Sequence, residues 1–415
     1  MRLLKRISYN PKWVINITDV GHLTSDADEG EDKLEKGASR EGKTAQEIAD
    51  FYTQNFLDGL KRLNFSEPDE IPRATDNIPE QIAMIQKLES ANYTYQISDG
   101  VYFDVSKFPA YADFANLNLS QQHGSGRVEA NGQKRSPADF ALWKFSPTDK
   151  QRDMEWDSPW GKGFPGWHIE CSAMILKFLS ATIDIHGGGV DHIPVHHTNE
   201  IAQSEAANNK TLANYWFHTN HIMVNDQKIA KSEGNGITLE DIEAKGYDLM
   251  ALRLLVISSH YRTQSAFSWE NLDAAQNRLK NLRAFADLRW QPVSGGGKPI
   301  SARDLNALYP LLEEDLDTPA ALAAIAEVAE RAQEQLVSKE AVTQLNAYLE
   351  LLDELLGLNL LGSSDITEVQ KSIMSKREAA RTNQTWDEAD NLRQQLQEQG
   401  IEINDTPKGP IWNRK

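Results

Sequence analysis

The sequence predicts an α/β core interrupted by an inserted subdomain and followed by an all-helical C-terminal region. Apolar, strand-like runs alternate with helix-forming segments between residues 164 and 269, as in α/β proteins. Residues 121–136 are rich in Gly, Ser and charge, which is typical of a loop within an insertion, and the composition turns helical after Gly295-Gly296-Gly297. We therefore predict the core in 1–92 and 156–295, the insertion in 93–155 and the helical region in 300–415.

The first predicted element is a buried strand, Trp13–Asp19, that runs into a polar loop of the kind that holds ligands in α/β proteins. A helix follows, because Thr44 and Glu47 have the spacing of a capping box. Asn77 and Glu80 repeat that spacing ahead of a second helix. Apolar residues recur at helical intervals in the first of these helices: Ile48, Phe51, Tyr52 and Phe56.

The middle of the chain contains two further strand signals. Val101–Val105 predicts a short strand in the insertion, and Ile183–His186 predicts a strand that ends at a tight turn made by Gly187-Gly188-Gly189. Residues 197–208 are good helix formers and predict a helix after that turn. Together these elements predict that the α/β alternation resumes after the insertion.

Helix signals dominate after residue 300. Thr318-Pro319 reads as a cap followed by a proline in the first turn, Thr385 and Glu388 as a capping box, and Gly400 as a helix terminator. An apolar stripe predicts a buried helix face: Leu345, Tyr348, Leu349, Leu352 and Leu356. Residues 303–400 are therefore predicted to form a helical bundle.

Composition narrows the class of protein. A chain of 415 residues allows two or three domains, and no apolar stretch approaches the length of a membrane span. The start of the chain lacks the apolar core of a signal peptide, so we expect a cytoplasmic protein without a membrane partner. The net charge of −18 would repel nucleic acid at long range, so such binding must depend on local clusters of Lys and Arg.

One cysteine stands out because it is the only one and has suitable neighbours. Cys171 precedes His196 by 25 residues, and His196 and Glu200 are four apart in a helix-forming segment, so their side chains share one face. Thiolate, imidazole and carboxylate are all zinc ligands, and three of them leave a fourth position open. The alternatives are a small buried hydrophobic residue and a surface His–Glu pair.

Two other motifs offer groups for binding a nucleotide. Lys228 and Lys231 place two ammonium groups in a loop with Gly and Ser, where they would suit the charge that develops during loss of pyrophosphate. Gly188 and Gly189 permit close approach of a ligand to the backbone, and Asp191 would accept hydrogen bonds from ribose hydroxyls. The alternatives are a solvated lysine pair and a plain glycine turn.

These motifs occur in an order that resembles the cysteinyl-tRNA synthetases, which are class I aminoacyl-tRNA ligases. The resemblance covers nearly the whole chain. The matching stretches are Asn16–Asp19, Val101–Phe108, Ser136–Lys144, Trp156–Gly161, Gly166–Met174, Asp184–Glu205, Lys228–Asn235, Glu314–Leu322 and Trp386–Trp412. The resemblance implies a Rossmann-like nucleotide-binding core and a helical region that approaches the anticodon side of the tRNA.

The resemblance also implies roles for particular residues. Cys171, His196 and Glu200 match zinc ligands of the family, where the metal binds the thiolate of the substrate cysteine. Trp167 and Thr18 match residues that line the amino-acid pocket. A thiolate-selective metal rejects serine because a hydroxyl is a harder and far less acidic ligand.

The implied reaction has two steps. The carboxylate of cysteine attacks the α-phosphorus of ATP, which is bound with Mg²⁺, and the adenylate is then transferred to tRNA(Cys). Lys228 and Lys231 match the two lysines of the family's Lys-Met-Ser-Lys-Ser loop, and Gly188, Gly189 and Asp191 are assigned to the ATP side. At the C-terminal end, we expect local positive charge from Lys376, Arg377, Arg381, Arg393, Lys408, Arg414 and Lys415. We expect a monomer.

The chain departs from the family pattern in one respect. The family's His-x-Gly-His signature and its second zinc-binding cysteine do not occur in these 415 residues. We therefore expect that the first strand-helix unit of the core is missing, and the activity of the chain on its own stays an open question at this point. Two alternatives stay open: a related ligase that transfers cysteine to a small amine such as an amino sugar, and a non-catalytic remnant that binds zinc and tRNA.

Overall fold

The computed structural model describes residues 1–21, 37–38, 41–118, 132–147, 152–224, 227–228 and 236–415. These residues form two compact units. The first unit contains residues 11–61 and 67–221, and the second contains residues 1–10, 62–66 and 222–415. None of the described helices is both long and apolar enough to cross a lipid bilayer.

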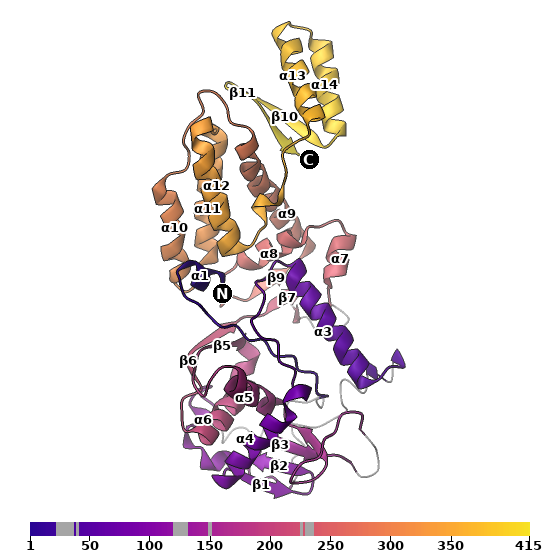
Figure 1. Cartoon of the computed structure of the whole chain (residues 1–415), viewed down its shortest axis with the longest axis vertical. Coiled ribbons are helices and arrows are strands. Elements are labelled where there is room, and N and C mark those ends of the chain that lie inside the picture. The colour runs from indigo at the N-terminus through magenta and orange to yellow at the C-terminus, as the bar shows by residue number, and fades with distance from the viewer. Residues whose placement is uncertain (22–36, 39–40, 119–131, 148–151, 225–226, 229–235) are drawn as a thin grey trace. The chain divides into compact units, whose positions relative to one another are not determined.

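The first unit is an α/β assembly with two sheets (Figure 1). Strands β1 to β4 form an antiparallel sheet in chain order, whereas β5 and β6 pair in parallel with Ile183 opposite Ala213. Its elements are α3 (Ala45–Arg62, whose last residue belongs to the second unit), α4 (Ile78–Ser90), β1 (Thr94–Ile97), β2 (Gly100–Phe103), β3 (Phe140–Phe145), β4 (Gly163–Pro165), α5 (Trp167–Phe178), β5 (Ile183–Gly189), α6 (Thr198–Asn208) and β6 (Ala213–Thr219).

The antiparallel sheet supplies much of the first unit's core. Every residue of β2 is buried, and Phe103 on β2 stacks on Phe140 of β3 with ring centroids 5.0 Å apart. Leu88 of α4 and Ile169 of α5 belong to the same apolar cluster. The helix α5 is therefore fixed against the sheet by burial of its apolar residues. The strand predicted at Val101–Val105 is confirmed as β2.

The strand predicted at Trp13–Asp19 is wrong. The segment makes only isolated parallel bridges, Val14 with Glu70 and Ile17 with Arg73. N–H groups at Ile15 and Ile17 donate to the carbonyls of Glu70 and Pro72, at 3.1 and 2.8 Å. The returning bond from position 72 cannot form, because proline has no backbone N–H. One proline in the partner segment thus interrupts the ladder.

The predicted cap of α3 is confirmed, but its apolar face is not. Thr44 N–H donates to Oε2 of Glu47 at 2.8 Å, and Glu47 N–H donates to Oγ1 of Thr44 at 3.2 Å. Of the four apolar residues predicted to share a face, Ile48 is buried. The other three, Phe51, Tyr52 and Phe56, are 53%, 41% and 43% exposed.

The predicted cap of α4 is wrong, because the side chain of Asn77 is used elsewhere. Lys177 Nζ donates to its Oδ1 at 2.8 Å, and its Nδ2 donates to the carbonyl of Arg73 at 2.6 Å. Pro79 does lie in the first turn of the helix, as predicted.

The glycine turn predicted at Gly187–Gly189 is also wrong. All three glycines continue β5, and Gly187, Gly188 and Gly189 pair in register with Phe217, His218 and Thr219 of β6. The strand is instead followed by a 3₁₀ turn, Val190–His192, and a π-helical turn, Ile193–His197, which leads directly into α6. The helix predicted over 197–208 is confirmed. The connection from β5 through α6 to β6 is a parallel crossover of the kind that α/β proteins use.

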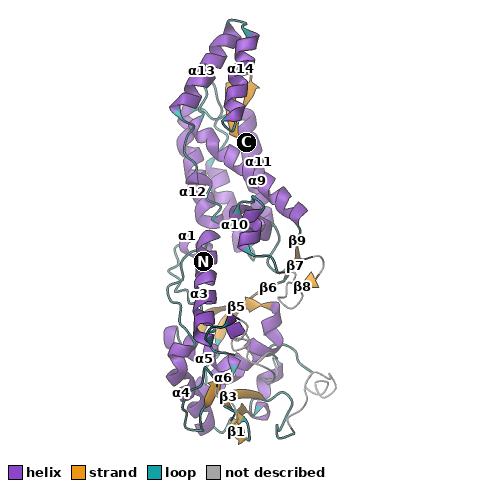
Figure 2. Ribbon diagram, turned by 90° about the vertical axis from the view of Figure 1, so that its right-hand side faces the viewer, coloured by secondary structure: helices purple, strands orange, loops and turns teal. Residues whose placement is uncertain are grey.

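The second unit is mainly helical and ends in a β-hairpin (Figures 1 and 2). The hairpin, β10 with β11, is antiparallel, and β8, β7 and β9 form a small sheet in that order. The elements are α1 (Arg2–Arg6), β7 (Ile222–Val224), β8 (Gln227–Lys228), α7 (Leu239–Ala244), α8 (Leu249–Ile257), β9 (Ser265–Phe267), α9 (Trp269–Asp287), α10 (Ala302–Glu313), α11 (Thr318–Gln335), α12 (Val342–Leu356), α13 (Glu368–Thr382), α14 (Trp386–Glu398), β10 (Ile401–Thr406) and β11 (Gly409–Arg414).

The helices predicted over residues 303–400 are present as α10 to α14, but they contribute to two cores rather than to one bundle, and we call α8 to α12 the helical bundle. All five residues of the stripe on α12 lie in one core cluster with apolar residues of α8, α9, α10 and α11. The hairpin was not predicted from the sequence. It forms a separate small core with α13 and α14, in which Leu396, Ile403 and Trp412 are buried. We call residues 363–415 the C-terminal domain.

Helix caps in this unit differ from two predictions. Asp317, not Thr318, caps α11, because its side chain accepts from the N–H of Ala320 at 3.0 Å. The hydroxyl of Thr385 donates to the carbonyl of Ala380 at 3.0 Å and lies 3.3 Å from Oε2 of Glu388, but it accepts no bond from a backbone N–H of α14. Gly400 has φ +78° after the end of α14, which agrees with its predicted role as terminator.

Candidate metal and substrate site

The three predicted metal ligands come together in the first unit. Cys171 lies on α5, His196 lies in the π-helical turn before α6, and Glu200 lies in the first turn of α6. One ligand atom from each lies within 4.8 Å of the others. Helix α5 and the segment that runs from the π-helical turn into α6 thus bring sulfur, nitrogen and oxygen donors together.

The start of α5 is fixed by close contact with the sheet. Gly166 precedes the helix, and its N–H donates to the carbonyl of Leu142 at 3.0 Å. A Cβ at this position would lie 2.1 Å from the carbonyl oxygen of Ala141, so only glycine fits without displacing the strand. This contact determines where Cys171, five residues later, enters the site.

Glu200 is the electrostatic centre of the site. It is fully buried, and its two carboxylate oxygens lie 2.5 Å from Nε2 of His186 and 2.5 Å from Nε2 of His196. Burial alone would raise the pKa of Glu200, but the two imidazoles outweigh it and hold this pKa well below its usual value. Glu200 is therefore a carboxylate at neutral pH.

Cys171 has the opposite shift. Burial, followed by the nearby charges of Glu200 and Glu170, raises the pKa of its thiol well above the usual value. In the protein without metal the thiol is therefore neutral. A cation at this point would favour the thiolate, since metal binding displaces the proton of a ligating cysteine.

The donor set and its surroundings fit a zinc ion. Oε1 of Glu200 is buried and accepts no well-aligned hydrogen bond, although Nε2 of His196 lies only 2.5 Å away. The other ring nitrogen of His196, Nδ1, lies 2.9 Å from Nδ1 of His168. A histidine that ligates a metal normally has its second ring nitrogen hydrogen-bonded, and here the partner of that nitrogen is another histidine. Thiol, imidazole and carboxylate together match the ligands of zinc.

His186 and His197 are among the site residues that were missed from the sequence. His186, His197 and Glu200 form a second group whose ligand atoms lie within 4.8 Å of one another. Burial, the largest cause, lowers the pKa of His197 to about 3, and its Nδ1 lies 2.8 Å from Nε2 of His218. Clustering would have revealed both, because seven of the ten histidines lie at positions 168, 186, 192, 196, 197, 218 and 221.

The predicted pocket residues lie beside the ligands. The ring of Trp167 is 4.7 Å from that of His196, measured between centroids. Asn16 Nδ2 donates to Oγ1 of Thr18 at 3.2 Å and to Sγ of Cys171 at 3.5 Å. Asn16 therefore links Thr18 to the thiol of Cys171. Asn16 was not predicted as a site residue, although it begins the Asn-Ile-Thr-Asp motif.

The predicted nucleotide residues lie next to the histidine cluster. A Cβ at Gly188 would lie 2.6 Å from Cε1 of His197, and one at Gly189 would lie 2.4 Å from Oδ1 of Asp191. The glycines thus leave room for His197 and Asp191, which follow the strand, to pack close to its backbone, and they do not form a turn. Asp191 is exposed in the 3₁₀ turn after β5.

The structure leaves the two predicted lysines undecided. Lys228 belongs to the second unit, where its backbone in β8 pairs with Met223 of β7, but its side chain lies outside what the structure describes. Lys231 lies outside the described residues altogether. Their role stays a prediction.

Part of the basic charge predicted at the C-terminal end is paired with carboxylates of the same chain. Arg377 and Arg381 both form ion pairs with Asp405, and Arg414 pairs with Asp287. Lys376 and Arg393 are exposed. Counting arginines in the sequence therefore overestimates the positive charge that this surface offers to a ligand, because three of them already pair with carboxylates.

Comparison with known proteins finds two matching family profiles, which together cover most of the chain. A family profile described as "tRNA synthetases class I (C) catalytic domain" matches residues 1–277, and one described as "Cysteinyl-tRNA ligase anticodon binding domain" matches residues 363–412. The chain is 45% identical to cysteine–tRNA ligase 1 of Burkholderia lata over 414 residues, which cover 98% of this chain and 85% of that protein. It is 37% identical to the cysteine–tRNA ligase of Thermus thermophilus over 430 residues, which cover 99% of this chain and 88% of that protein.

A solved structure resembles the fold. The methionyl-tRNA synthetase of Mycobacterium tuberculosis, in complex with methionyl-adenylate, has a TM-score of 0.58 with coverage of 86% of both chains. At 15% sequence identity this likeness concerns the fold alone. It agrees with the predicted α/β core.

Proposed function

Because this chain belongs to the class I cysteine–tRNA ligases, we propose that it activates cysteine with ATP and transfers it to tRNA(Cys), using a zinc ion held by Cys171, His196 and Glu200. The observation that carries the zinc proposal is the convergence of these three donors within 4.8 Å, next to Trp167. The substrate amino acid would then bind at the fourth position of the zinc ion, which these three residues leave open.

Zinc bound here would supply a Lewis acid with an open position for the thiolate of cysteine. The residues around it explain how the substrate is held. Trp167 forms an apolar wall beside His196, and Asn16 and Thr18 offer an amide and a hydroxyl for the polar groups of an amino acid. Serine would lack the soft sulfur that such a site selects, so discrimination needs no second hydrolytic site.

We assign Gly188, Gly189 and Asp191 to the ATP side of the site, with Mg²⁺ accompanying the phosphates. Gly188 and Gly189 are extended and partly exposed, and Asp191 is exposed directly after β5. Parallel strands in α/β proteins present ligand groups at their carboxyl ends, where these residues lie. Lys228 and Lys231 are assigned to the phosphates through the family motif alone.

The C-terminal domain is the proposed contact for the anticodon. Trp386, at the start of α14, is 59% exposed, and Lys376 and Arg393 are exposed on the same two-helix domain. Exposed aromatic rings are platforms on which unpaired RNA bases stack, and exposed cationic side chains attract the phosphates. The negative charge of Asp405 should repel RNA only weakly, because Arg377 and Arg381 both pair with it.

The decisive experiment measures cysteine-dependent ATP–pyrophosphate exchange and charging of tRNA(Cys), with serine as the competing amino acid. We expect exchange with cysteine and not with serine, and loss of both exchange and bound zinc in His196→Ala. His260→Ala, a histidine of the second unit outside the site, is the matched control and should retain both. Equal zinc content in His196→Ala and the unchanged protein would reject the metal assignment.

The same assay separates the two alternatives. Cysteine transferred to a glucosamine-type amine and not to tRNA would favour the small-amine ligase, which the comparisons do not support. Binding of tRNA without any exchange would favour a non-catalytic remnant.

A further inference from the structure

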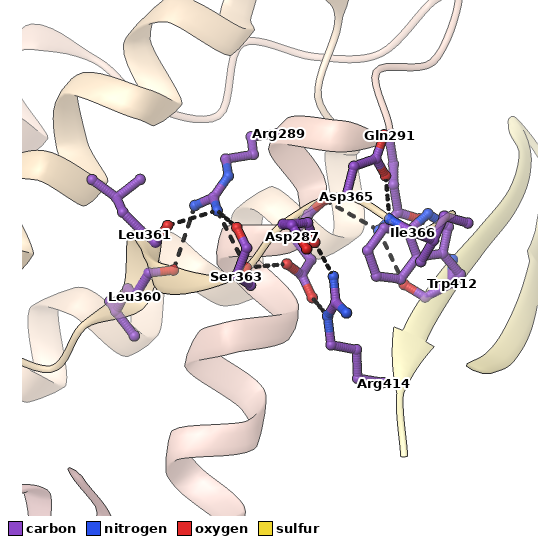
Figure 3. Close-up of polar contacts among 11 residues, drawn as sticks. Asp287, Arg289, Gln291, Leu360, Leu361, Ser363, Asp365, Ile366, Trp412 and Arg414 are labelled. Atoms are coloured by element: carbon purple, nitrogen blue, oxygen red, sulfur yellow. Dashed lines mark hydrogen bonds and ion pairs between the residues drawn. The ribbon is translucent and has the colours of Figure 1, made fainter. Parts of the chain in front are cut away.

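The helical bundle and the C-terminal domain are joined by a dense set of polar contacts (Figure 3). One side is the end of α9 with the residues that follow it, which supply Asp287, Arg289 and Gln291. The other side is the connecting segment 360–366 together with strand β11 at the end of the chain. We call these contacts the joint.

Asp287 is the buried centre of the joint. Its side chain is 1% exposed, and its two oxygens face two different parts of the C-terminal domain. Oδ1 accepts from the hydroxyl of Ser363 at 2.8 Å, and Oδ2 accepts from Nε of Arg414 at 2.9 Å. A buried carboxylate held by a charge-assisted hydrogen bond is a strong and directional contact. The carboxylate of Asp287 thus binds both the connecting segment and the last strand.

Arg289 and Gln291 extend the contact along the backbone. Arg289 is buried, and its guanidinium donates to the carbonyls of Leu361 and Ser363 at 3.2 and 2.7 Å. The side-chain amide of Gln291 donates to the carbonyl of Trp412 at 3.0 Å and accepts from its N–H at 2.6 Å. Gln291 therefore pairs with β11 as a neighbouring strand would.

The joint holds the C-terminal domain at two points. One is where the chain enters the domain, at Ser363, and the other is where the chain ends, at Trp412 and Arg414. A domain attached only by a connecting segment rotates freely about it. Attachment at both points restricts that rotation.

We propose that the joint is a positioning element for tRNA, and that Asp287 and Gln291 are positioning residues. The proposal rests on the proposed function, because it assumes that the C-terminal domain binds the anticodon. Contacts with two parts of one tRNA reinforce each other only when the protein holds both contact surfaces at the right separation. A rigid joint keeps the effective concentration of the second contact high, and a loose joint lowers it.

The test uses two RNA probes and the full-length protein. Binding of the tRNA(Cys) transcript and of its isolated anticodon stem-loop is measured by fluorescence anisotropy for Gln291→Ala, Asp287→Asn and the double variant. We expect the dissociation constant for full-length tRNA to rise roughly tenfold, because the linked contacts lose effective concentration. Binding of the stem-loop, which engages the C-terminal domain alone, should stay within about twofold.

A matched control is available inside the bundle. Arg331 Nη2 lies 2.7 Å from Oδ1 of Asp304, with exposures of 36% and 17%, against 39% and 1% for Arg414 and Asp287. Arg331 also donates to a backbone carbonyl, as Arg414 does. Arg331→Gln therefore removes a similar ion pair that does not cross the joint, and it should leave both dissociation constants unchanged.

Two outcomes would overturn the proposal: full-length tRNA bound equally well by the joint variants and the unchanged protein, or both RNAs weakened to the same degree. Cysteine-dependent pyrophosphate exchange, measured alongside, should be unchanged in the joint variants because it involves no tRNA. Absence of exchange in the unchanged protein would count against the proposed function, whereas the two binding constants would still decide the role of the joint.

Discussion

The hydroxyl of Ser172 donates to Oε1 of Gln203 at 2.8 Å, and this bond joins the two helices that carry the candidate metal ligands. Ser172 follows Cys171 on α5, and Gln203 lies one helical turn after Glu200 on α6. Both side chains are buried, with exposures of 1% and 0%. The bond therefore fixes how far the thiol lies from the carboxylate.

Ser172→Ala should weaken both the fold and the metal site. The substitution leaves Oε1 of Gln203 buried without its donor, which costs about 1–3 kcal/mol. Zinc affinity should fall by about tenfold or more, as for other residues that support a ligand. Urea unfolding and competition with a chromophoric chelator measure the two effects. Ser375→Ala, which removes an exposed hydroxyl bonded to the carbonyl of Lys371, should change neither.

Asn16→Ala should weaken zinc binding without unfolding the protein. The substitution removes the amide that donates to Sγ of Cys171, a bond that favours the thiolate over the thiol. A lost hydrogen bond of this kind is worth about 0.5–1.5 kcal/mol, so the zinc dissociation constant should rise up to about tenfold. Cobalt substitution offers a direct check, because the sulfur-to-cobalt charge-transfer band should shift. An unchanged band and affinity would show that the amide does not act on the sulfur.

Gly188→Ala and Gly187→Ala should differ sharply although the residues are neighbours. A Cβ at Gly188 would lie 2.6 Å from Cε1 of His197 and 2.9 Å from Nδ1 of His192, whereas one at Gly187 meets nothing closer than 3.7 Å. Overpacking of this kind costs about 1–3 kcal/mol. Thermal unfolding should therefore show a clear loss for Gly188→Ala alone. Equal melting temperatures for the two variants would contradict the packing described here.

The C-terminal domain should lose stability in acid through Asp405. Two parallel hydrogen bonds from Arg377, each 2.8 Å, are the main cause that lowers the pKa of Asp405 from 3.8 to about 2. A carboxyl group whose pKa is lower in the folded state stabilises it fully above pH 3.8, and this stability is lost as the pH falls to about 2.

Amide hydrogen exchange of residues 368–414 measures this loss. Protection in the unchanged protein should fall as the pH drops through this range, once the intrinsic exchange rates are corrected. Asp405→Asn should be less protected at neutral pH and show a flatter profile. Parallel profiles for the two proteins would mean that another group controls the acid transition.

Local chemistry in the sequence was enough to predict several elements. The reciprocal bonds of Thr44 and Glu47 need only residues three apart, and the apolar stripe on α12 needs only the helical period. The contact between His196 and Glu200 was also expected from residues four apart, although His196 lies in the π-helical turn that leads into α6. Such features depend on contacts within a few residues of chain.

Predictions failed where a distant residue decided the outcome. Asn77 fits a cap position, but Lys177 takes its side-chain oxygen, so no cap forms. The strand predicted at 13–19 is interrupted by Pro72, which lies more than fifty residues away in the partner segment. The three glycines of β5 were read as a turn, because nothing local shows that His197 packs against Gly188.

The order of the motifs and the residue types along the chain were enough to indicate the family and to single out Cys171, His196 and Glu200 as candidate metal ligands. The groups that surround these residues became visible in the folded protein. The tertiary structure placed His186 against Glu200, Asn16 against Cys171, and Asp287 against Arg414. The reason is physical: these contacts join residues 14, 155 and 127 positions apart, and only packing of the folded core brings such groups within bonding distance.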